Sequence, residues 1–212
     1  MENNSAIFNK SYDDLSKLYE ASYTKYVFVF DFDLTLTFKS SDGMKMNSNY
    51  MDLFESNTKL SKLKEYLKKI NDLGNTNYIN TRGIVNDINH ILKNVGIEIG
   101  PNKMIKEIKG SKNIENINTP FTKLELKNHN LIDIKDTNVL WAIKKVTYLN
   151  NIKEIEQVDN NRILFFDDSA ININTARLNG YDNCFLIGSN DSGLYGLDYL
   201  LIKLEQIIDL LF

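Results

Sequence analysis

Apolar side chains recur along this chain with two different periods, and the alternation between them predicts a mixed α/β structure. Short apolar runs rich in aromatic and β-branched residues predict buried strands. The predicted strands are 26–31, 77–81, 162–168 and 183–188. Apolar residues at intervals of three and four predict amphipathic helices between them. The predicted helices are 13–22, 59–73, 84–96, 138–157, 170–178 and 197–211.

Two stretches carry a weaker pattern. Residues 38–57 are polar and irregular, which indicates a loop or flap. The segment 97–136 contains two short apolar pieces, KMIKEI and FTKLEL, each of which is long enough for a strand. Because the other strands alternate with helices, the pattern predicts one α/β domain over 1–212, with a Rossmann-like parallel sheet sandwiched by helices. The excess at about 111–133 indicates a small insertion.

Paired carboxylates follow two of the predicted strands. The run VFVFDFDLTLT places Asp31 and Asp33 after the first strand, and RILFFDD places Asp167 and Asp168 at the end of another. Ligands of open parallel sheets bind at the carboxyl ends of the strands, so we expect all four carboxylates in one crevice. Their mutual repulsion would be relieved by Mg²⁺, a hard cation that prefers oxygen ligands. The alternative is that one pair merely caps a helix or ends a solvated loop.

A phosphorylated ligand would also need groups that hold its phosphate. Thr81, in NTRG, ends the second predicted strand, where a hydroxyl and a backbone N–H can bind a phosphate oxygen. A threonine in front of a helix is, however, more often a simple N-cap. Arg82 follows directly and could reach a substrate phosphate or carboxylate, although a solvated arginine is the more common case.

Together these motifs resemble the haloacid dehalogenase-like (HAD) superfamily of aspartate-nucleophile phosphatases. The first motif of that superfamily, an apolar strand followed by Asp-x-Asp-x-Thr, is matched by Asp31, Asp33 and Thr35. The second, a strand ending in Thr or Ser, is matched by Thr81, and the fourth, a strand ending in two acidic residues, by ILFFDD. The resemblance extends from Val27 to about Leu204 and implies the HAD-like fold.

The third motif of the superfamily is a lysine on the helix before the fourth motif, and two residues compete for it. Lys144 and Lys145 are adjacent, and the resemblance to the small magnesium-dependent phosphatases favours Lys145 by its distance from Asp167. Either lysine could instead be a solvated helix charge. About twenty residues separate the first motif from the next helix, too few for a substantial helical cap. The resemblance therefore implies a capless or minimally capped enzyme with an open crevice.

The resemblance also implies a role for each site residue. Asp31 would attack phosphorus and form an aspartyl-phosphate, while Asp33 would protonate the leaving oxygen and later accept a proton from water. Lys145 and Thr81 would complete a positive cradle for the phosphoryl group. The residues expected around Mg²⁺ are Asp31, Asp33 (by its carbonyl), Asp167 and Asp168.

The activity implied in this way is Mg²⁺-dependent hydrolysis of phosphate monoesters. An Asp at position 33, with a proton to give, favours ester hydrolysis. Two alternatives remain: a catalytically inactive module that uses the acidic crevice to bind a metal or partner, and a phosphotransferase built on the same motifs. The substrate stays open between a small molecule, a phosphoprotein and a nucleic-acid end, and an oligomer could cover the site.

Composition limits the binding partners and the cellular location that we expect. The net charge of −3 gives no electrostatic argument for binding nucleic acid or an anionic membrane. No apolar run is long enough to span a bilayer, and the N-terminal residues do not resemble a signal peptide. The single cysteine, Cys184, cannot form an internal disulfide, which favours a reducing, cytoplasmic location.

Overall fold

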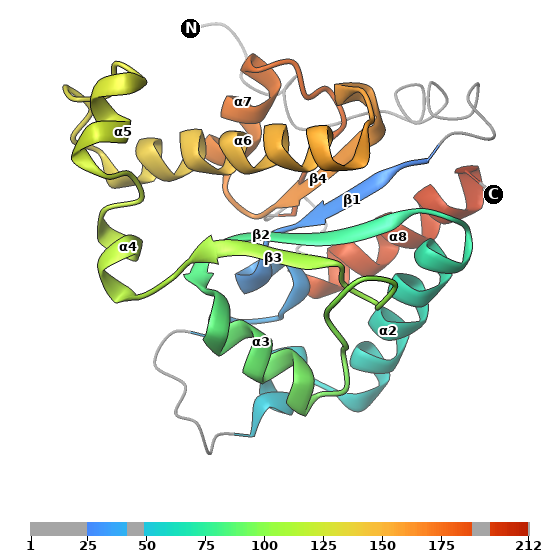
Figure 1. Ribbon diagram of the computed structural model, residues 1–212. Helices are drawn as coiled ribbons and strands as arrows, with labels where there is room; N and C mark the ends of the chain where they lie inside the picture. Colours follow the sequence, from blue (N-terminus) through green and yellow to red (C-terminus); the bar gives the residue numbers. More distant parts are fainter. Residues whose placement is uncertain (1–24, 42–48, 188–195, 212) are drawn as a thin grey trace, which may run out of the picture.

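The computed structural model describes residues 25–41, 49–187 and 196–211, so the expected helix over 13–22 lies outside the described residues. At its centre is a five-stranded sheet with the strand order β3-β2-β1-β4-β5, in which all neighbouring strands are parallel (Figure 1). The predicted α/β fold with a Rossmann-like sheet is confirmed. The strands are β1 (Val27–Phe30), β2 (Thr76–Ile84), β3 (Glu107–Ser111), β4 (Ile163–Asp167) and β5 (Cys184–Leu186).

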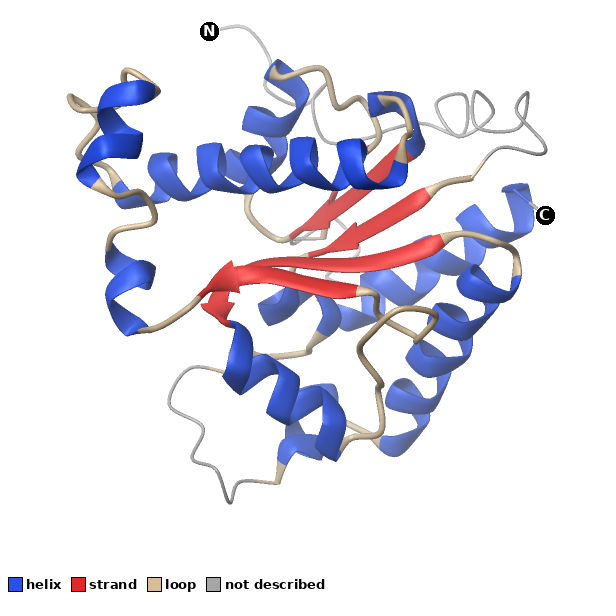
Figure 2. Cartoon of the chain, viewed as in Figure 1, coloured by secondary structure: helices blue, strands red, loops and turns tan. Residues whose placement is uncertain are grey.

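Helices cover both faces of the sheet, as Figure 2 shows by the red strands between blue layers. One face is packed by α2 (Asn57–Asp72), α3 (Val85–Asn94) and α8 (Leu197–Leu211), the other by α6 (Thr137–Glu156) and α7 (Ala170–Leu178). All five helices were predicted from the sequence, and for α2, α3 and α8 the prediction came from an apolar stripe. Among the described residues, none of the helices combines the length and the apolar character that crossing a membrane requires.

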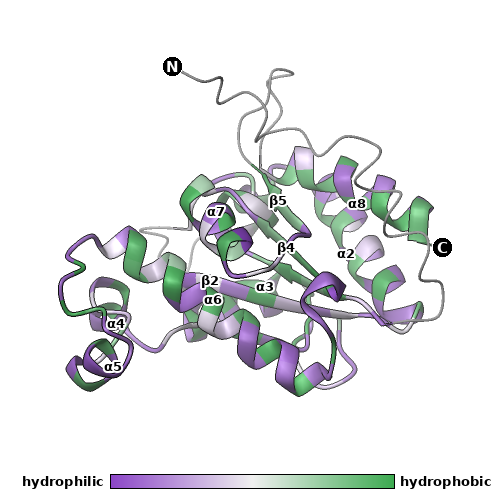
Figure 3. Ribbon diagram, turned by 90° about the horizontal axis from the view of Figure 1, so that it is seen from above, coloured by the Kyte–Doolittle hydropathy of each residue, from purple (hydrophilic) through white to green (hydrophobic). Residues whose placement is uncertain are grey.

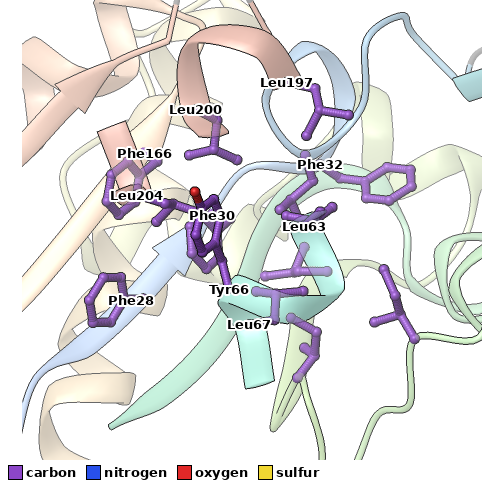
Figure 4. Close-up of a cluster of buried hydrophobic side chains, with 14 of the residues drawn as sticks. Phe28, Phe30, Phe32, Leu63, Tyr66, Leu67, Phe166, Leu197, Leu200 and Leu204 are labelled. Carbon is purple, nitrogen blue, oxygen red and sulfur yellow. The ribbon is translucent and has the colours of Figure 1, made fainter. Parts of the chain in front are cut away.

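Aromatic rings form the centre of the larger core, on the face covered by α2, α3 and α8. Residues two apart on a strand share a face, so Phe28 and Phe30 of β1 point the same way. The rings of Phe30 and Phe166 stack at 5.1 Å, and those of Phe166 and Phe185 at 4.8 Å. In Figure 4, Leu204 of α8 lies against this row. The almost wholly apolar run before Asp31 is therefore explained by burial on both faces of the sheet.

The second core lies on the face covered by α6 and α7. Val27 and Val29 of β1 pack there with Phe165 of β4, and all three are fully buried. Figure 3 shows β4 and β5 as largely hydrophobic. Cys184 of β5 is also fully buried in this cluster, and its Sγ lies 3.0 Å from the carbonyl oxygen of Tyr181. The central strands thus have no solvated face, as expected of a parallel sheet.

The segment 97–136 corrects one strand prediction. FTKLEL lies mainly in the short helix α5 (Lys123–Asn128), not in a strand. The helix begins with a capping box: Thr122 Oγ1 accepts a hydrogen bond from Glu125 N at 3.2 Å, and Glu125 accepts one from Thr122 N at 2.7 Å. This reciprocal cap favours a helical first turn over an extended one. The other piece, KMIKEI, contributes only its last two residues to β3.

The expected loop or flap over 38–57 contains a short element of its own. Tyr50–Phe54 form a 3₁₀ helix, and Leu53 and Phe54 are fully buried in the larger core. Residues 42–48 lie outside the described residues. The second half of this stretch is therefore part of the packed domain.

Between β3 and α6 the chain forms a small helical insertion from α4 (Ile114–Asn118) and α5. Phe121, Leu131 and Leu140 give it a cluster of buried apolar side chains separate from the two main cores. Trp141 of α6 ties it to the domain by donating from Nε1 to the carbonyl oxygen of Ile117 at 2.7 Å. Figures 1 and 3 both show α4 and α5 at the end of the molecule opposite α2 and α8.

Candidate active site

The chain turns sharply after β1, and this turn directs two aspartates into one cavity. Asp31 N donates to the carbonyl oxygen of Phe166 at 2.8 Å, which extends the ladder one residue past the strand. Residues Phe32–Leu36 then form a short helical segment, in which Leu34 adopts a left-handed φ of 57°. Asp33 accepts a hydrogen bond from Ser41 N at 2.6 Å. Both Asp31 and Asp33 line the cavity at the carboxyl ends of the strands.

Lys145 joins the two acidic strand ends. Its side chain is only 3% exposed, and its Nζ lies 2.8 Å from Asp31 Oδ1 and 2.6 Å from Asp167 Oδ2. Asn80 of β2 donates from Nδ2 to the backbone oxygen of Lys145 at 3.0 Å. This hydrogen bond holds the turn of α6 that carries the lysine against the sheet.

Lys144, the competing candidate, has different partners. Its Nζ lies 3.1 Å from Glu125 Oε1 and 4.5 Å from the centre of the Phe121 ring, both in the insertion. Neighbouring residues on a helix point about 100° apart. Lys145 therefore reaches the carboxylates, whereas Lys144 holds the insertion to α6.

Asp167 is fully buried, and each of its oxygens has a partner. Oδ1 accepts from Ser169 N at 2.9 Å and from Asn172 Nδ2 at 2.8 Å, while Oδ2 contacts Lys145. Asn172 is on the first turn of α7, directly after the acidic pair. The start of this helix therefore fixes the orientation of the Asp167 carboxylate.

The charges of this group are strongly coupled. Burial raises the pKa of Asp167 to about 6, although the charge of Lys145 opposes this. Burial and the neighbouring charge of Asp31 raise the pKa of Asp168 to about 7. Burial lowers the pKa of Lys145, but the two carboxylates outweigh it and hold that pKa above its usual value. Lys145 is therefore charged, and three carboxylates compete for it.

The carboxylates of Asp31, Asp167 and Asp168 can hold a metal ion. Each offers one oxygen, and these oxygens lie within 4.8 Å of one another. An all-oxygen set with two or three carboxylates suits Mg²⁺, which keeps some water ligands. The Asp33 carboxylate is not in this group, and it accepts a hydrogen bond from Ser41 N. Only its backbone carbonyl remains as a candidate ligand from that residue.

Thr81 also lines the cavity, although not at a strand end as predicted. β2 continues to Ile84, three residues further than the alternating pattern indicated. Thr81 Oγ1 accepts a hydrogen bond from Gly83 N at 3.0 Å. A Cβ on Gly83 would lie 2.7 Å from Ile88 Cδ1, so a larger residue at 83 would require the end of the Ile88 side chain to shift. This local bond leaves the hydroxyl proton of Thr81 available to a ligand.

The cavity that these residues share has a volume of about 650 Å³. Its lining includes two groups of residues, called here the floor (Asp31, Asp33, Asp168 and Lys145) and the wall (Arg82 of β2, Ile117 of α4 and Trp141 of α6). Sites for small molecules commonly measure 300–1,000 Å³. The cavity is therefore large enough for a phosphorylated metabolite. The insertion contributes Ile117 to its lining.

No family model matches the chain, and no curated protein matches its sequence. Among solved structures, it is similar to a probable YrbI-family phosphatase from Pseudomonas syringae, with 13% identity over 93% of this chain and 91% of that chain, at a TM-score of 0.50. Two further matches have a TM-score of 0.44 and 13% identity. They are a substrate-bound phosphoserine phosphatase (76% and 93% covered) and a haloacid dehalogenase-like hydrolase from Streptococcus pneumoniae (84% and 90%).

The chain has the haloacid dehalogenase-like fold. At these identities the similarity concerns the fold alone, and any function has to be argued from the site. Within this HAD-like fold, the first, second and fourth motifs meet at one cavity, together with Lys145.

Several site residues were not predicted from the sequence. Ser41 and Trp141 belong to no motif: Ser41 contacts Asp33 through its backbone N–H, which does not depend on residue type, and Trp141 contacts Ile117, 24 positions away. The amide next to the apolar residues Tyr78 and Ile79 of NYINT is the signal that could have indicated Asn80. A buried amide needs a hydrogen-bond partner, and here that partner is α6.

Proposed function

We propose that this chain is a Mg²⁺-dependent phosphatase that hydrolyses phosphate monoesters through an aspartyl-phosphate on Asp31. The observation that carries the proposal is the bridge from Lys145 to Asp31 and Asp167, with a carboxylate oxygen of Asp168 within 4.8 Å of both aspartates. The single positive charge of Lys145 does not neutralise the negative charges of three largely buried carboxylates. The excess negative charge supports a site built to take up a cation.

The residues of the cavity floor account for the two chemical steps. Asp31 attacks phosphorus through a carboxylate oxygen, and the bond from phosphorus to the leaving oxygen breaks. Asp33 gives its proton to that oxygen. Water then attacks the phosphorus of the aspartyl-phosphate, gives its proton to Asp33, and releases phosphate with Asp31 restored. Lys145 and Thr81 bind the phosphoryl oxygens during both steps.

Mg²⁺, when bound, supplies the charge neutralisation that lets an anionic nucleophile approach an anionic phosphate. Asp31, Asp167 and Asp168 would hold it with the backbone carbonyl of Asp33. Asn172 and Ser169 orient Asp167 for this role through their hydrogen bonds to Oδ1. Contacts of this kind commonly accompany metal ligands.

The size of the cavity favours a small phosphorylated molecule over a phosphoprotein or a nucleic-acid end. Ile117 and Trp141 line the same cavity as the carboxylates, so part of the insertion contributes to a site of metabolite size. The single buried cysteine supports a reducing, cytoplasmic location. No contact in the described residues favours an inactive module. A phosphotransferase would use the same floor with an acceptor other than water.

The test compares Asp31→Asn and Asp33→Asn with the unaltered protein on an aryl ester, 4-nitrophenyl phosphate, and an alkyl ester, glycerol 3-phosphate. Asp31→Asn is expected to abolish turnover of both. Asp33→Asn should lose on the order of 100-fold or more on the alkyl ester but much less on the aryl ester, because nitrophenolate leaves without a proton. Chelation of Mg²⁺ should remove all activity, and added Mg²⁺ should restore it.

Asp72→Asn provides the matched control, since it makes the same change on the exposed end of α2. Its kcat on both esters should equal that of the unaltered protein. Equal losses on both esters for Asp33→Asn would contradict the acid–base role. Full turnover in excess chelator would contradict the metal role of the three carboxylates.

A further inference from the structure

Arg82 places a cation in the wall of the cavity, which also contains the carboxylates of the floor. Among the described residues its recorded contact is a hydrogen bond from Nη1 to Asn138 Oδ1 at 3.3 Å, and it forms no ion pair. A guanidinium has five N–H donors in a planar fork. The bond to a neutral amide uses one of them, so most of the donors remain available to a ligand.

The position of Arg82 follows from the length of β2. Phe30 pairs with Ile79, so Arg82 lies three residues beyond the level of Phe30. The register of β2 with β3 shifts between Asn80 and Ile84, so Arg82 lies in an irregular stretch of the strand, past the level of Asp31. Because Arg82 and Asp31 come from different strands and line the same cavity, a group bound by Arg82 would be separate from the phosphoryl group on Asp31.

The apolar part of the same wall comes from two residues held together by one hydrogen bond. Trp141 donates to the carbonyl oxygen of Ile117, and both line the cavity. Trp141 is 3% exposed, so its ring is fixed by packing. This surface can contact the carbon skeleton of a leaving group, between the cation of Arg82 and the floor.

The charges around the cavity limit what Arg82 can bind. Among the described residues that line it, the only other cation is Lys145, which Asp31 and Asp167 already hold. Asp136, at the start of α6, lines the rim and is exposed to solvent, so its charge is screened. A second anion on a substrate therefore has one favourable position in the described part of the cavity, at Arg82.

We infer that Arg82, with Ile117 and Trp141, forms a leaving-group subsite that selects phosphate monoesters carrying a second anionic group, either a carboxylate or another phosphate. This inference rests on the proposed phosphatase function. A bidentate contact from arginine suits both anions, because both present two coplanar oxygens.

The experiment measures kcat/KM for two matched pairs of esters. One pair adds a carboxylate (glycerol 3-phosphate and 3-phosphoglycerate), and the other adds a phosphate (fructose 6-phosphate and fructose 1,6-bisphosphate). The unaltered protein should prefer the second member of at least one pair by about 10- to 100-fold, the range expected for a charge-assisted hydrogen bond. Arg82→Gln should reduce that ratio to near one, and Arg82→Lys should give an intermediate value.

Arg162→Gln is the matched control. The guanidinium of Arg162 lies over the ring of Tyr26, directly before β4 and β1, and Arg162 does not line the cavity. Arg162→Gln changes the net charge by the same amount as Arg82→Gln. It should keep the ratio of the unaltered protein. The pair that shows the preference identifies the anion as carboxylate or phosphate.

Binding to Asp31→Asn in saturating Mg²⁺, measured by calorimetry, repeats the comparison without turnover. A ratio that Arg82→Gln leaves unchanged, or no preference in either pair, would overturn the subsite while leaving the phosphatase proposal intact. A different result would overturn the phosphatase proposal and keep the subsite: none of the four esters is turned over, but the ratio of the Kd values within a pair still depends on Arg82.

Discussion

At the scale of single residues, the acidic pairs could be predicted and their partner could not. Asp31 and Asp167 stand out because carboxylates that end apolar strands need compensation. Lys144 and Lys145 have the same chemistry and neighbouring positions, so only the resemblance separated them. The direction in which each side chain leaves α6 decides between them, and that direction is set by packing of α6 on the sheet.

This difference predicts opposite results for two substitutions. Lys145→Met should lower kcat at least 100-fold, because it removes the cation that binds both the nucleophile and the phosphoryl oxygens. It should also destabilise the protein by about 3 kcal/mol at pH 7, because two buried carboxylates lose their partner. Lys144→Met should change kcat less than threefold. Steady-state kinetics and urea unfolding measure both, and comparable losses of activity would contradict the assignment.

At the scale of elements, most strands and helices followed from periodicity, and the segment between β3 and α6 did not. FTKLEL has the apolar content of a strand, yet Thr122 and Glu125 already carry the spacing of a capping box in the sequence. This capping-box spacing predicts α5 when it is given more weight than the apolar content of the segment. The contact of Trp141 with Ile117 joins residues 24 positions apart, and no local pattern encodes it.

The insertion should respond locally to the loss of that contact. Trp141→Phe keeps an aromatic ring but removes the Nε1 donor, so the carbonyl oxygen of Ile117 loses its partner. We expect the free energy of unfolding to fall by about 1 kcal/mol. Amide hydrogen exchange should become at least tenfold faster in α4 while that of β1 stays unchanged, because local opening does not require global unfolding. Equal acceleration in both elements would mean that the bond stabilises the whole domain instead.

At the scale of the whole molecule, the end of the sheet away from the cavity has its own buried charge. Glu156, at the end of α6, contacts Lys25, Lys106 and the hydroxyl of Tyr78. Burial alone would raise its pKa, but the hydrogen bonds from the two lysines and Tyr78 bring that pKa below its ordinary value. No local sequence pattern indicates this cluster, since its members come from four separate segments.

This cluster predicts a pH-dependent contribution to stability. A carboxyl whose pKa is lowered on folding stabilises the folded state above its unfolded pKa, about 4.3, and that gain is lost as pH falls through the folded value. Glu156→Gln should therefore cost about 1–2 kcal/mol at pH 7, a moderate value because both lysines are partly solvated. Urea unfolding should show the cost shrinking below pH 4.

Glu154→Gln is the control, since Glu154 lies on the same helix and is exposed. Its effect should stay within about 0.5 kcal/mol at every pH. A cost for Glu156→Gln that is the same at pH 7 and pH 3.5 would show that shape, and not charge, makes this position important.

The buried cysteine has a practical consequence for studying this chain. Because the sequence contains one thiol and that thiol lies within the second core, a thiol-directed reagent can modify the protein at a single position and only after the core has opened. The rate of modification therefore reports how often the β5 edge separates from the rest of the domain. A ligand that binds in the cavity stabilises the folded domain and would therefore slow this reaction. Ligands can thus be screened on the unaltered chain by the rate at which Cys184 is modified.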